Sequence, residues 1–426
     1  MLKLFERWFV VLMLFYLSSG LLGFIWPDSE TSLFRPESSA ALLAIQTILY
    51  GVTFLLIALR WERFKRGILA GRWALALALL AICSAMWADD PNLTLRRGLV
   101  LLGTTAFGIY LGSAFSLREQ LQLITRAFGL ILLLSIFCAL AFPQYGVDRE
   151  IHGGDWQGIF AQKNLLGKAM IISTIAFLSS GGLYRRWVRW AFVAASILVA
   201  LLSNSLTSLA TIGVLLLLAP AYRLLRVKKK TLIPVLIGIG TGMATAIFLA
   251  IRNQEIVLQL MDRSISLTGR TDIWRFVWEA ISQRMVLGYG FNGFWEGIGG
   301  ASASVILSLG WVAKHAHDGF LDLWLELGIV GLALFAMGYF SALREAIHLL
   351  TNDRSPEATW PMQYLAFMFV YHITEGPILR QNSLYWALYT ATLVCVSSWQ
   401  WHAERSTAEI PAEGNSLEPQ LDYLPG

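Results

Sequence analysis

The feature that most constrains this chain is a succession of apolar runs, each about 20 residues long, the length a helix needs to cross a bilayer. Of its 426 residues, 56% are hydrophobic and only 14% are charged, and the mean hydropathy is +0.59. Such a composition lies outside the range of soluble globular domains. The sequence therefore predicts an all-α polytopic membrane protein.

The apolar runs predict about twelve membrane spans. They lie near residues 8–25, 40–59, 71–87, 97–115, 121–142, 164–181, 187–203, 205–222, 231–251, 320–342, 361–378 and 383–401. An even number of spans places both chain ends on the same side. The first run follows Lys3 and Arg7, lacks a small-residue cleavage site, and is predicted to be a retained anchor.

The placement of positive charge predicts the orientation. The net charge is +5, and basic clusters occupy alternate loops on the side of the N-terminus: residues 60–72, 185–189 and 223–230. The positive-inside rule makes that side cytoplasmic, in an inner membrane. Nucleic-acid binding is the alternative explanation of a basic chain, but each cluster adjoins a predicted span, so no nucleic-acid partner is predicted.

Four segments follow from the spans. Residues 1–251 hold nine spans with short loops, 252–319 form a large periplasmic loop, 320–401 hold three more spans, and 402–426 form a disordered cytoplasmic tail. Since only one outer loop is large, the chemistry of the chain is expected there.

Inside the large loop, an apolar stripe predicts an interfacial helix on the outer leaflet. Its members are Trp274, Trp278, Ile281 and Met285, flanked by Ile273 and Val277. Thr271 is the expected N-cap with Asp272 in the first turn, which places Arg270 just before the helix N-terminus. An arginine there can bind a lipid diphosphate, and the alternative is a headgroup anchor or ion pair.

The loop continues with Gly288–Trp295, which spells the dinucleotide pattern GxGxxG. A dinucleotide site is excluded because the pattern follows an amphipathic helix rather than a strand. Its aromatic residues suit stacking on sugars, or form a plain wall of the loop.

His317 is the predicted general base, because a histidine near neutrality can take a proton from a sugar hydroxyl. A structural histidine is the alternative. A metal site with His315 and Asp318 lacks an evident third and fourth ligand, so no metal is predicted.

Two further groups lie at predicted outer membrane edges. Lys163 and Asn164 begin one span, and Glu375 ends another. Ionisable groups at membrane depth are functional candidates, although Glu375 can also pair structurally with Arg380.

Five motifs in this order resemble one bacterial family. They are GIFAQKNLLG, SLTGRTDIW, LGYGFNGFW, HAHDGFLDLWLELGIVGL and TEGPIL, between Gly158 and Leu379. Together they resemble the O-antigen ligase and Wzy-type polysaccharide polymerase superfamily, most closely its exopolysaccharide-polymerase branch.

The resemblance implies a GT-C-like membrane glycosyltransferase that uses a glycan on undecaprenyl diphosphate, without metal, nucleotide sugar or cofactor. The family histidine falls on His317, the loop arginine on Arg270, the KN pair on Lys163 and Asn164, and the acid on Glu375. Where the family commonly has Asn, this chain has Asp318, which can raise the basicity of His317 or compete with it. A basic residue common in the turn 203–207 is missing, so Arg149 or Lys163 is left to supply the second positive charge.

The hypothesis assigns three roles. Arg270 binds the donor diphosphate with help from Lys163, Asn164, Arg149 or Arg263. His317 deprotonates the acceptor for inverting attack, and Glu375 orients His317 or an arginine. The acceptor or lipid path is expected to be lined by Trp274, Trp278, Tyr289, Phe294, Trp295 and Asp318.

The predicted function is polymerisation of lipid-linked repeat units into exopolysaccharide or O-antigen, with membrane lipid and a chain-length regulator as further partners. The close alternative is a ligase that transfers the glycan to the lipid A core. The alternative from another class is a polysaccharide or lipid transporter.

Overall fold

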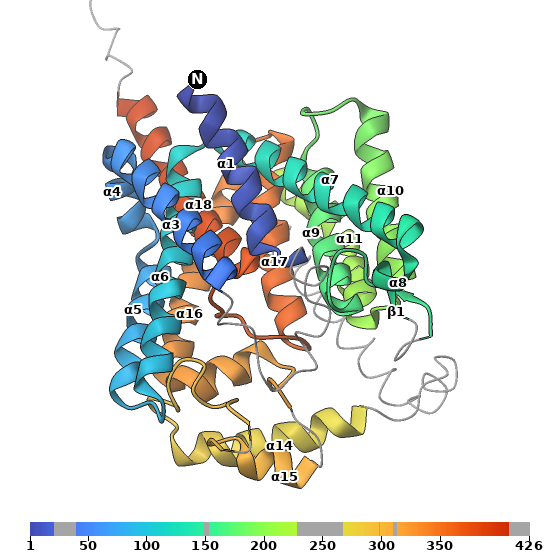
Figure 1. Cartoon of the computed structure of the whole chain (residues 1–426). Helices are drawn as coiled ribbons and strands as arrows, with labels where there is room; N and C mark the ends of the chain where they lie inside the picture. Colours follow the sequence, from blue (N-terminus) through green and yellow to red (C-terminus); the bar gives the residue numbers. More distant parts are fainter. Residues whose placement is uncertain (21–39, 149–152, 228–266, 298, 310–312, 409–426) are drawn as a thin grey trace, which may run out of the picture.

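The computed structural model describes residues 1–20, 40–148, 153–227, 267–297, 299–309 and 313–408. The described chain is mainly helical (Figure 1). Its elements are α1 (Leu2–Leu17), α3 (Ala40–Leu59), α4 (Trp61–Ala70), α5 (Arg72–Cys83), η2 (Ser84–Met86), α6 (Pro91–Ala114), α7 (Leu117–Ala141), α8 (Pro143–Gly146), β1 (Val147–Asp148), β2 (Asp155–Trp156), α9 (Lys163–Ser179), α10 (Arg186–Leu202), α11 (Leu206–Val227), α14 (Leu267–Gln283), α15 (Ala303–Leu309), α16 (Gly319–Asn352), η4 (Pro356–Thr359), α17 (Trp360–His372) and α18 (Leu384–Ala408).

Within the described residues, three helices, α3, α7 and α16, are long and apolar enough to cross a membrane. A fourth candidate is the bent pair of α4 with α5 and η2, whose two parts meet at 83°. The structure thus confirms a mainly helical membrane protein. The count of twelve spans and the GT-C-like arrangement stay predictions, and the predicted span 231–251 lies outside the described residues.

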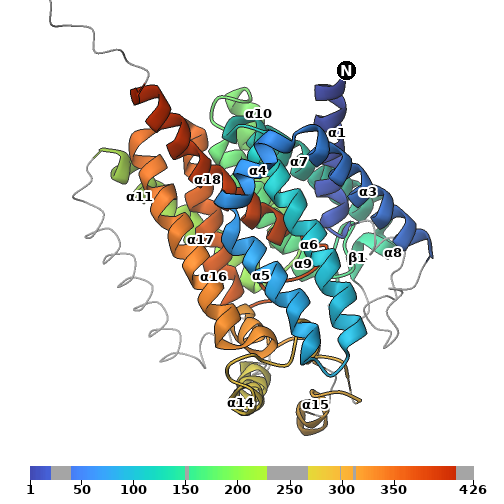
Figure 2. The same cartoon turned by 90° about the vertical axis from the view of Figure 1, so that its left-hand side faces the viewer.

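Long helices run side by side, and the N-terminus and the end of α18 lie at the same end of the bundle (Figures 1 and 2). Helices α14 and α15 lie at the opposite end, and α14 runs across the bundle rather than along it. The N-terminus and the end of α18 therefore lie at the end of the bundle opposite α14 and α15.

Close packing of α6 against α18 depends on small residues. A Cβ atom at Gly108 would lie 2.7 Å from the carbonyl oxygen of Ala387, and one at Gly112 would lie 2.8 Å from that of Ala391. Glycines let two helix backbones approach in this way inside a membrane, where packing rather than the hydrophobic effect holds helices together. The contact therefore holds α18 directly against α6.

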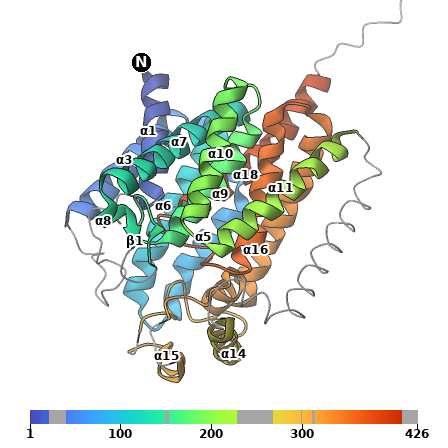
Figure 3. The ribbon, with the colours of Figure 1, turned by 90° about the vertical axis from the view of Figure 1, so that its right-hand side faces the viewer.

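Helices α9, α10 and α11 lie beside one another (Figure 3). Ser173 of α9 shares a 2.7 Å hydrogen bond with Ser196 of α10, and Phe177 stacks on Phe192 at 4.5 Å between ring centroids. A hydroxyl pair and a stacked ring pair therefore hold α9 against α10.

Several boundaries differ from the predicted spans. The basic loop predicted between 60 and 70 is the helix α4, because its Phe64 is buried and Gly67 packs closely on Ser113 of α6. Helix α6 begins six residues before position 97, because the Asp90 side chain accepts the Leu93 amide at 3.0 Å and Pro91 stands at the first helical position.

The C-terminal boundaries also need correction. Helix α17 ends at His372 instead of 378, because Gly376 has φ +38 and Pro377 follows it. Helix α18 extends to Ala408, so residues 402–408 are helical rather than part of a disordered tail. The paired strands β1 and β2 form a small exception to the predicted all-α class.

Helix α16 is broken at Gly328, whose φ of 65° and ψ of −170° are not helical. The segment before Tyr289 occupies the gap: Ile329 donates to the Met285 carbonyl at 2.9 Å, and Tyr289 donates to the Leu325 carbonyl at 2.9 Å. The carbonyls and amides that the break releases are therefore satisfied by the loop.

We expect Gly328→Ala to destabilise the protein markedly. A φ of 65° with a ψ of −170° is essentially restricted to glycine and costs another residue about 1–3 kcal/mol, and the added Cβ would also collide with the Val286 carbonyl. Thermal unfolding in detergent measures the effect. Gly51→Ala in α3 is the matched control, because a Cβ there meets open space, and equal melting temperatures for the two variants would contradict the assignment.

Candidate functional site

His317 lies in the short segment that leads into α16. Its φ of 54° is rare for a residue with a side chain, and its amide donates to Nδ1 of His315 at 3.1 Å. The two imidazole rings lie 4.0 Å apart between centroids. A strained residue is held in place by its surroundings, so the local contacts of His317 decide what it can do.

Asp318 closes the N-terminus of α16. Its Oδ1 accepts the amides of Phe320 and Leu321 at 2.9 and 3.0 Å, so Asp318 is the N-cap of the helix. Burial raises the pKa of its carboxyl, and the two amide hydrogen bonds oppose that effect. Capping, rather than contact with His317, is the role that the structure gives this residue.

Asp322 anchors the segment that carries His317. Its Oδ1 accepts the amide of Ala316 at 2.9 Å and the indole N–H of Trp295 at 3.0 Å. The side chain is buried, and its Oδ2 has no hydrogen-bond partner among the described residues. One carboxylate thus ties the glycine-rich turn and the residue before His317 to the first turn of α16.

Glu375 lies beside His317. Its Oε2 is 3.8 Å from Nδ1 of His317, and its side chain is 9% exposed, against 26% for the histidine. Glu375 reaches this position for two reasons. Helix α17 has already ended before it, and Gly319 carries no Cβ atom, which would lie 2.7 Å from the carbonyl oxygen of Gly376. Two glycines therefore bring an acid and a histidine together from segments 58 residues apart.

A buried lysine completes this cluster. Lys168 of α9 lies over the rings of Tyr371 and Tyr385, at 4.6 and 4.0 Å from their centroids. It is attracted by Glu375 and repelled by Arg380. Because a buried ammonium needs compensation, the aromatic rings and Glu375 together make its position tenable.

The glycine-rich turn is a structural junction. Arg97 of α6 donates to the Asn292 carbonyl at 2.9 Å, and the Asn292 side chain donates to Gln381 at 2.9 Å. The backbone N–H of Asn292 also donates a hydrogen bond to the side chain of Glu326, a buried acid one helical turn after Asp322. The turn therefore links α6, α16 and the segment after α17.

The aromatic residues of the turn correct the predicted acceptor path. Tyr289 is 6% exposed and Phe294 is fully buried, and the Tyr289 hydroxyl donates to the Ala280 carbonyl at 3.0 Å. Their faces are occupied by the core of the loop and do not form an open wall. Trp295 is half-buried and held by Asp322.

Helix α14 also differs from its prediction. Ile273, Val277 and Ile281 are buried in a hydrophobic cluster made by the loop itself, whereas Trp278 is 51% exposed. The predicted apolar stripe therefore does not act as one lipid-facing surface, because these three residues pack on protein instead of lipid. Trp278 packs edge-on against Trp324 of α16, and Trp274 donates to the Ala316 carbonyl at 2.9 Å.

The predicted capping of α14 is wrong. The helix begins at Leu267, so Arg270 lies within its first turn and Thr271 is not the N-cap. Helical structure extends back through Thr268 and Gly269, although both residue types have low helix propensity. The Arg270 side chain lies outside the described part of the structure, as do Arg149 and Arg263 entirely.

Lys163, at the start of α9, has an anionic partner within the protein. Its Nζ is 2.6 Å from Oδ2 of Asp155, whose other oxygen accepts from Asn204 at 3.1 Å. Both side chains are largely buried. Asn164 follows and is half-buried. This pair joins the small sheet, α9 and the turn before α11.

The structure therefore brings together His317 and Glu375 of the predicted site and adds three groups that the sequence reasoning missed: Lys168, Asp322 and Glu326. Each stands in a strongly apolar helix. That was the available signal, because an ionisable residue in such a helix is a functional candidate wherever it falls.

Two sequence comparisons bear on this arrangement. Residues 166–336 match the family model described as O-Antigen ligase. The chain is also 24% identical over 347 residues, 78% of each chain, to the exopolysaccharide production protein ExoQ of Rhizobium meliloti (strain 1021). The matches confirm the resemblance that the motifs indicated.

Asp318 variants test the cap and its titration. Asp318→Ala should lower the free energy of unfolding by about 1 kcal/mol, while Asp318→Asn keeps an acceptor oxygen. Since burial raises the folded-state pKa of Asp318, the wild type should lose stability relative to the Asn variant as pH rises from about 4 through that raised pKa. Melting temperatures across this range check both effects, and a wild type that loses stability relative to the Asn variant on acidification would refute the second.

Asp322 variants test the anchoring of the His317 segment. Asp322→Ala leaves the Ala316 and Trp295 N–H groups buried without an acceptor, at about 1–3 kcal/mol each, whereas Asp322→Asn retains Oδ1. We expect a much lower melting temperature for the Asp322→Ala variant than for the Asp322→Asn variant. Equal stability of the two would show that the anchor carries little energy.

Proposed function

We propose that this chain is a membrane glycosyltransferase that polymerises undecaprenyl-diphosphate-linked repeat units into exopolysaccharide or O-antigen. The observation that carries the proposal is the approach of Glu375 to His317 at 3.8 Å, at the end of the bundle that holds α14. The family match covers this histidine, and the ExoQ protein is named for exopolysaccharide production.

In the proposed reaction, His317 is the base. A carboxylate on the Nδ1 side favours the tautomer in which Nδ1 carries the proton and Nε2 is free to accept one. Nε2 then takes the proton of an acceptor sugar hydroxyl, whose oxygen attacks the anomeric carbon of the donor. The bond between that carbon and the diphosphate oxygen breaks, the lipid diphosphate leaves with the electron pair, and the configuration inverts.

Glu375 acts as the positioning residue for His317. It stabilises the imidazolium that forms when the proton arrives, because it lies close and is shielded from water. Lys168 is attracted by Glu375, and its own charge is stabilised by two tyrosine rings. The chain from Lys168 to Glu375 to His317 is the cluster on which we expect the rate to depend.

The donor is bound on the other side of the site in this proposal. Arg270 in the first turn of α14 holds the diphosphate and stabilises its charge on departure, with Arg149, Arg263 and Asn164 as further ligands. Lys163 is held by Asp155 at 2.6 Å, so it joins the diphosphate only when that ion pair exchanges partners. No group in this scheme requires a metal or a cofactor.

The orientation and boundaries are part of the proposal. Both termini face the cytoplasm and the site faces the periplasm, with 252–319 as the catalytic loop between the spans of 1–251 and 320–401, ahead of the C-terminal tail. A chain-length regulator is the expected protein partner.

A reconstituted assay distinguishes polymerase from ligase. Purified protein in liposomes, given lipid-linked repeat units alone, should produce a ladder of longer chains. The description of the matched family favours a ligase as the second candidate, and transfer of glycan to lipid A core without any ladder would establish it. Accumulation of intact lipid-linked donor in both mixtures would count against a glycosyltransferase of either kind.

We expect His317→Ala to lower the polymerisation rate by about 10²–10⁴-fold, the usual contribution of a general base. Arg270→Ala should abolish polymer, and Glu375→Gln should reduce kcat more than it changes KM, because the neutral amide cannot stabilise an imidazolium. The control is His348→Ala, an exposed histidine near the far end of α16. A normal rate in the His317 variant would remove the histidine from the mechanism.

A further inference from the structure

A cavity of about 540 Å³ lies away from the proposed catalytic site, between α4, α5, the junction of α6 and α7, and α18. Helix α4 lies toward the end of the bundle that holds the N-terminus, opposite α14 (Figures 1 and 2). The size is within the range of small-molecule and headgroup sites, about 300–1,000 Å³. Its location separates it from the reaction proposed above.

Three arginines line this cavity: Arg63, Arg66 and Arg72. The contacts that the structure gives them are with carbonyls and a ring. Arg63 donates to the Ala114 carbonyl at 3.1 Å, Arg66 to that of Glu62 at 3.3 Å, and Arg72 lies over the Trp73 ring at 5.4 Å. Three like charges around one hollow repel one another until an anion enters.

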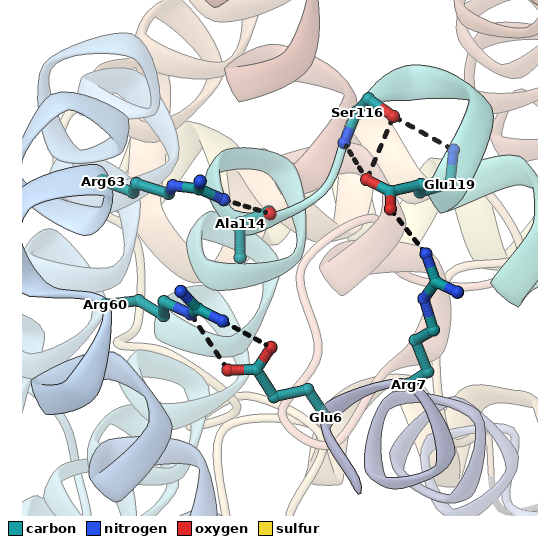
Figure 4. Close-up of polar contacts among 7 residues, drawn as sticks. All are labelled: Glu6, Arg7, Arg60, Arg63, Ala114, Ser116 and Glu119. Atoms are coloured by element: carbon teal, nitrogen blue, oxygen red, sulfur yellow. Dashed lines mark hydrogen bonds and ion pairs between the residues drawn. The ribbon is translucent and has the colours of Figure 1, made fainter. Parts of the chain in front are cut away.

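Glu119 also lines the cavity, but both it and the neighbouring Glu6 are paired with other arginines (Figure 4). Glu6 accepts two hydrogen bonds from Arg60, at 3.0 and 3.1 Å, and Glu119 accepts from Arg7 at 2.7 Å. Glu119 also forms the capping box with Ser116 at the start of α7. The acids at this end are thus bound to Arg60 and Arg7, while the cavity arginines lie outside both pairs.

The rest of the lining suits an amphiphile with a phosphate headgroup. The Ser113 and Ser398 hydroxyls, which donate to the Tyr110 and Cys395 carbonyls at 3.4 and 3.1 Å, add polar lining with acceptor oxygens. The start of the long helix α7 adds the positive end of its dipole. Leu69, Trp73 and Val394 form apolar wall. Acyl chains fit such walls, while a guanidinium binds phosphate oxygens in pairs.

We propose that this cavity binds the headgroup of an anionic phospholipid from the surrounding bilayer. Basic pockets between membrane helices recognise such headgroups through charge and hydrogen bonds together. The lipid neutralises the repulsion between the arginines and fills the angle between α4 and α5, which meet at 83°. An acidic lipid is therefore a structural ligand of this end of the bundle.

Native mass spectrometry of the full-length protein in detergent tests the site. Phosphatidylglycerol should remain bound where phosphatidylcholine with the same acyl chains does not. Arg66→Gln with Arg72→Gln should weaken phosphatidylglycerol binding about tenfold or more. Neither side chain has a hydrogen bond to another helix among the described residues, so the variant should keep the melting temperature of the wild type measured without lipid.

The matched control is Arg185→Gln with Arg186→Gln, which removes the same charge from exposed positions before and in the first turn of α10. It should change phosphatidylglycerol binding less than about twofold. Equal weakening by both double variants, or equal retention of phosphatidylcholine, overturns the proposal. Displacement of the lipid by millimolar inorganic phosphate also overturns it, since the site then recognises free anion. If the double variant unfolds, Arg66→Gln alone is compared under the same criteria.

Discussion

The structure depends on the pairing of ionisable groups that are buried among apolar helices. A charge that leaves water costs several kcal/mol unless a partner compensates for it. In this chain Glu6 binds Arg60 from another helix, and Lys168 is attracted by Glu375 of a distant segment. Lys163 holds Asp155, eight residues before it. Several arrangements of apolar helices can bury similar apolar surface. Each pairing favours the one arrangement that brings its two groups together, so the polar groups specify how the helices pack.

Hydrophobic runs of the expected length made the helical membrane class predictable, because span length follows from bilayer thickness. Runs such as 40–59 coincide with a helix, here α3. The ends of the helices were less predictable. The stop at His372 comes from Gly376 and the packing of Gly319 against it, and packing between segments far apart in sequence leaves no local pattern.

The candidate site was predictable to the extent that its residues carry their chemistry in their type and neighbours. His317 and Glu375 stood out as ionisable groups at membrane edges, and the structure places them 3.8 Å apart. Tyr289 and Phe294 were misassigned because aromatic residues in a glycine-rich turn look alike whether they face a ligand or a core. The cap role of Asp318 was hidden by its neighbour, since the same carboxylate next to His317 also suits catalysis.

The break at Gly328 has a consequence for how this protein can vary. Residues 285–290 supply hydrogen bonds that α16 would otherwise make with itself, so the loop is part of the helix that follows it. The two cannot be inherited or exchanged as separate modules. A chimera that takes its loop from a relative would also need that relative's first three turns of α16, and changes in substrate preference should arise by substitution inside the loop more readily than by replacement of the whole.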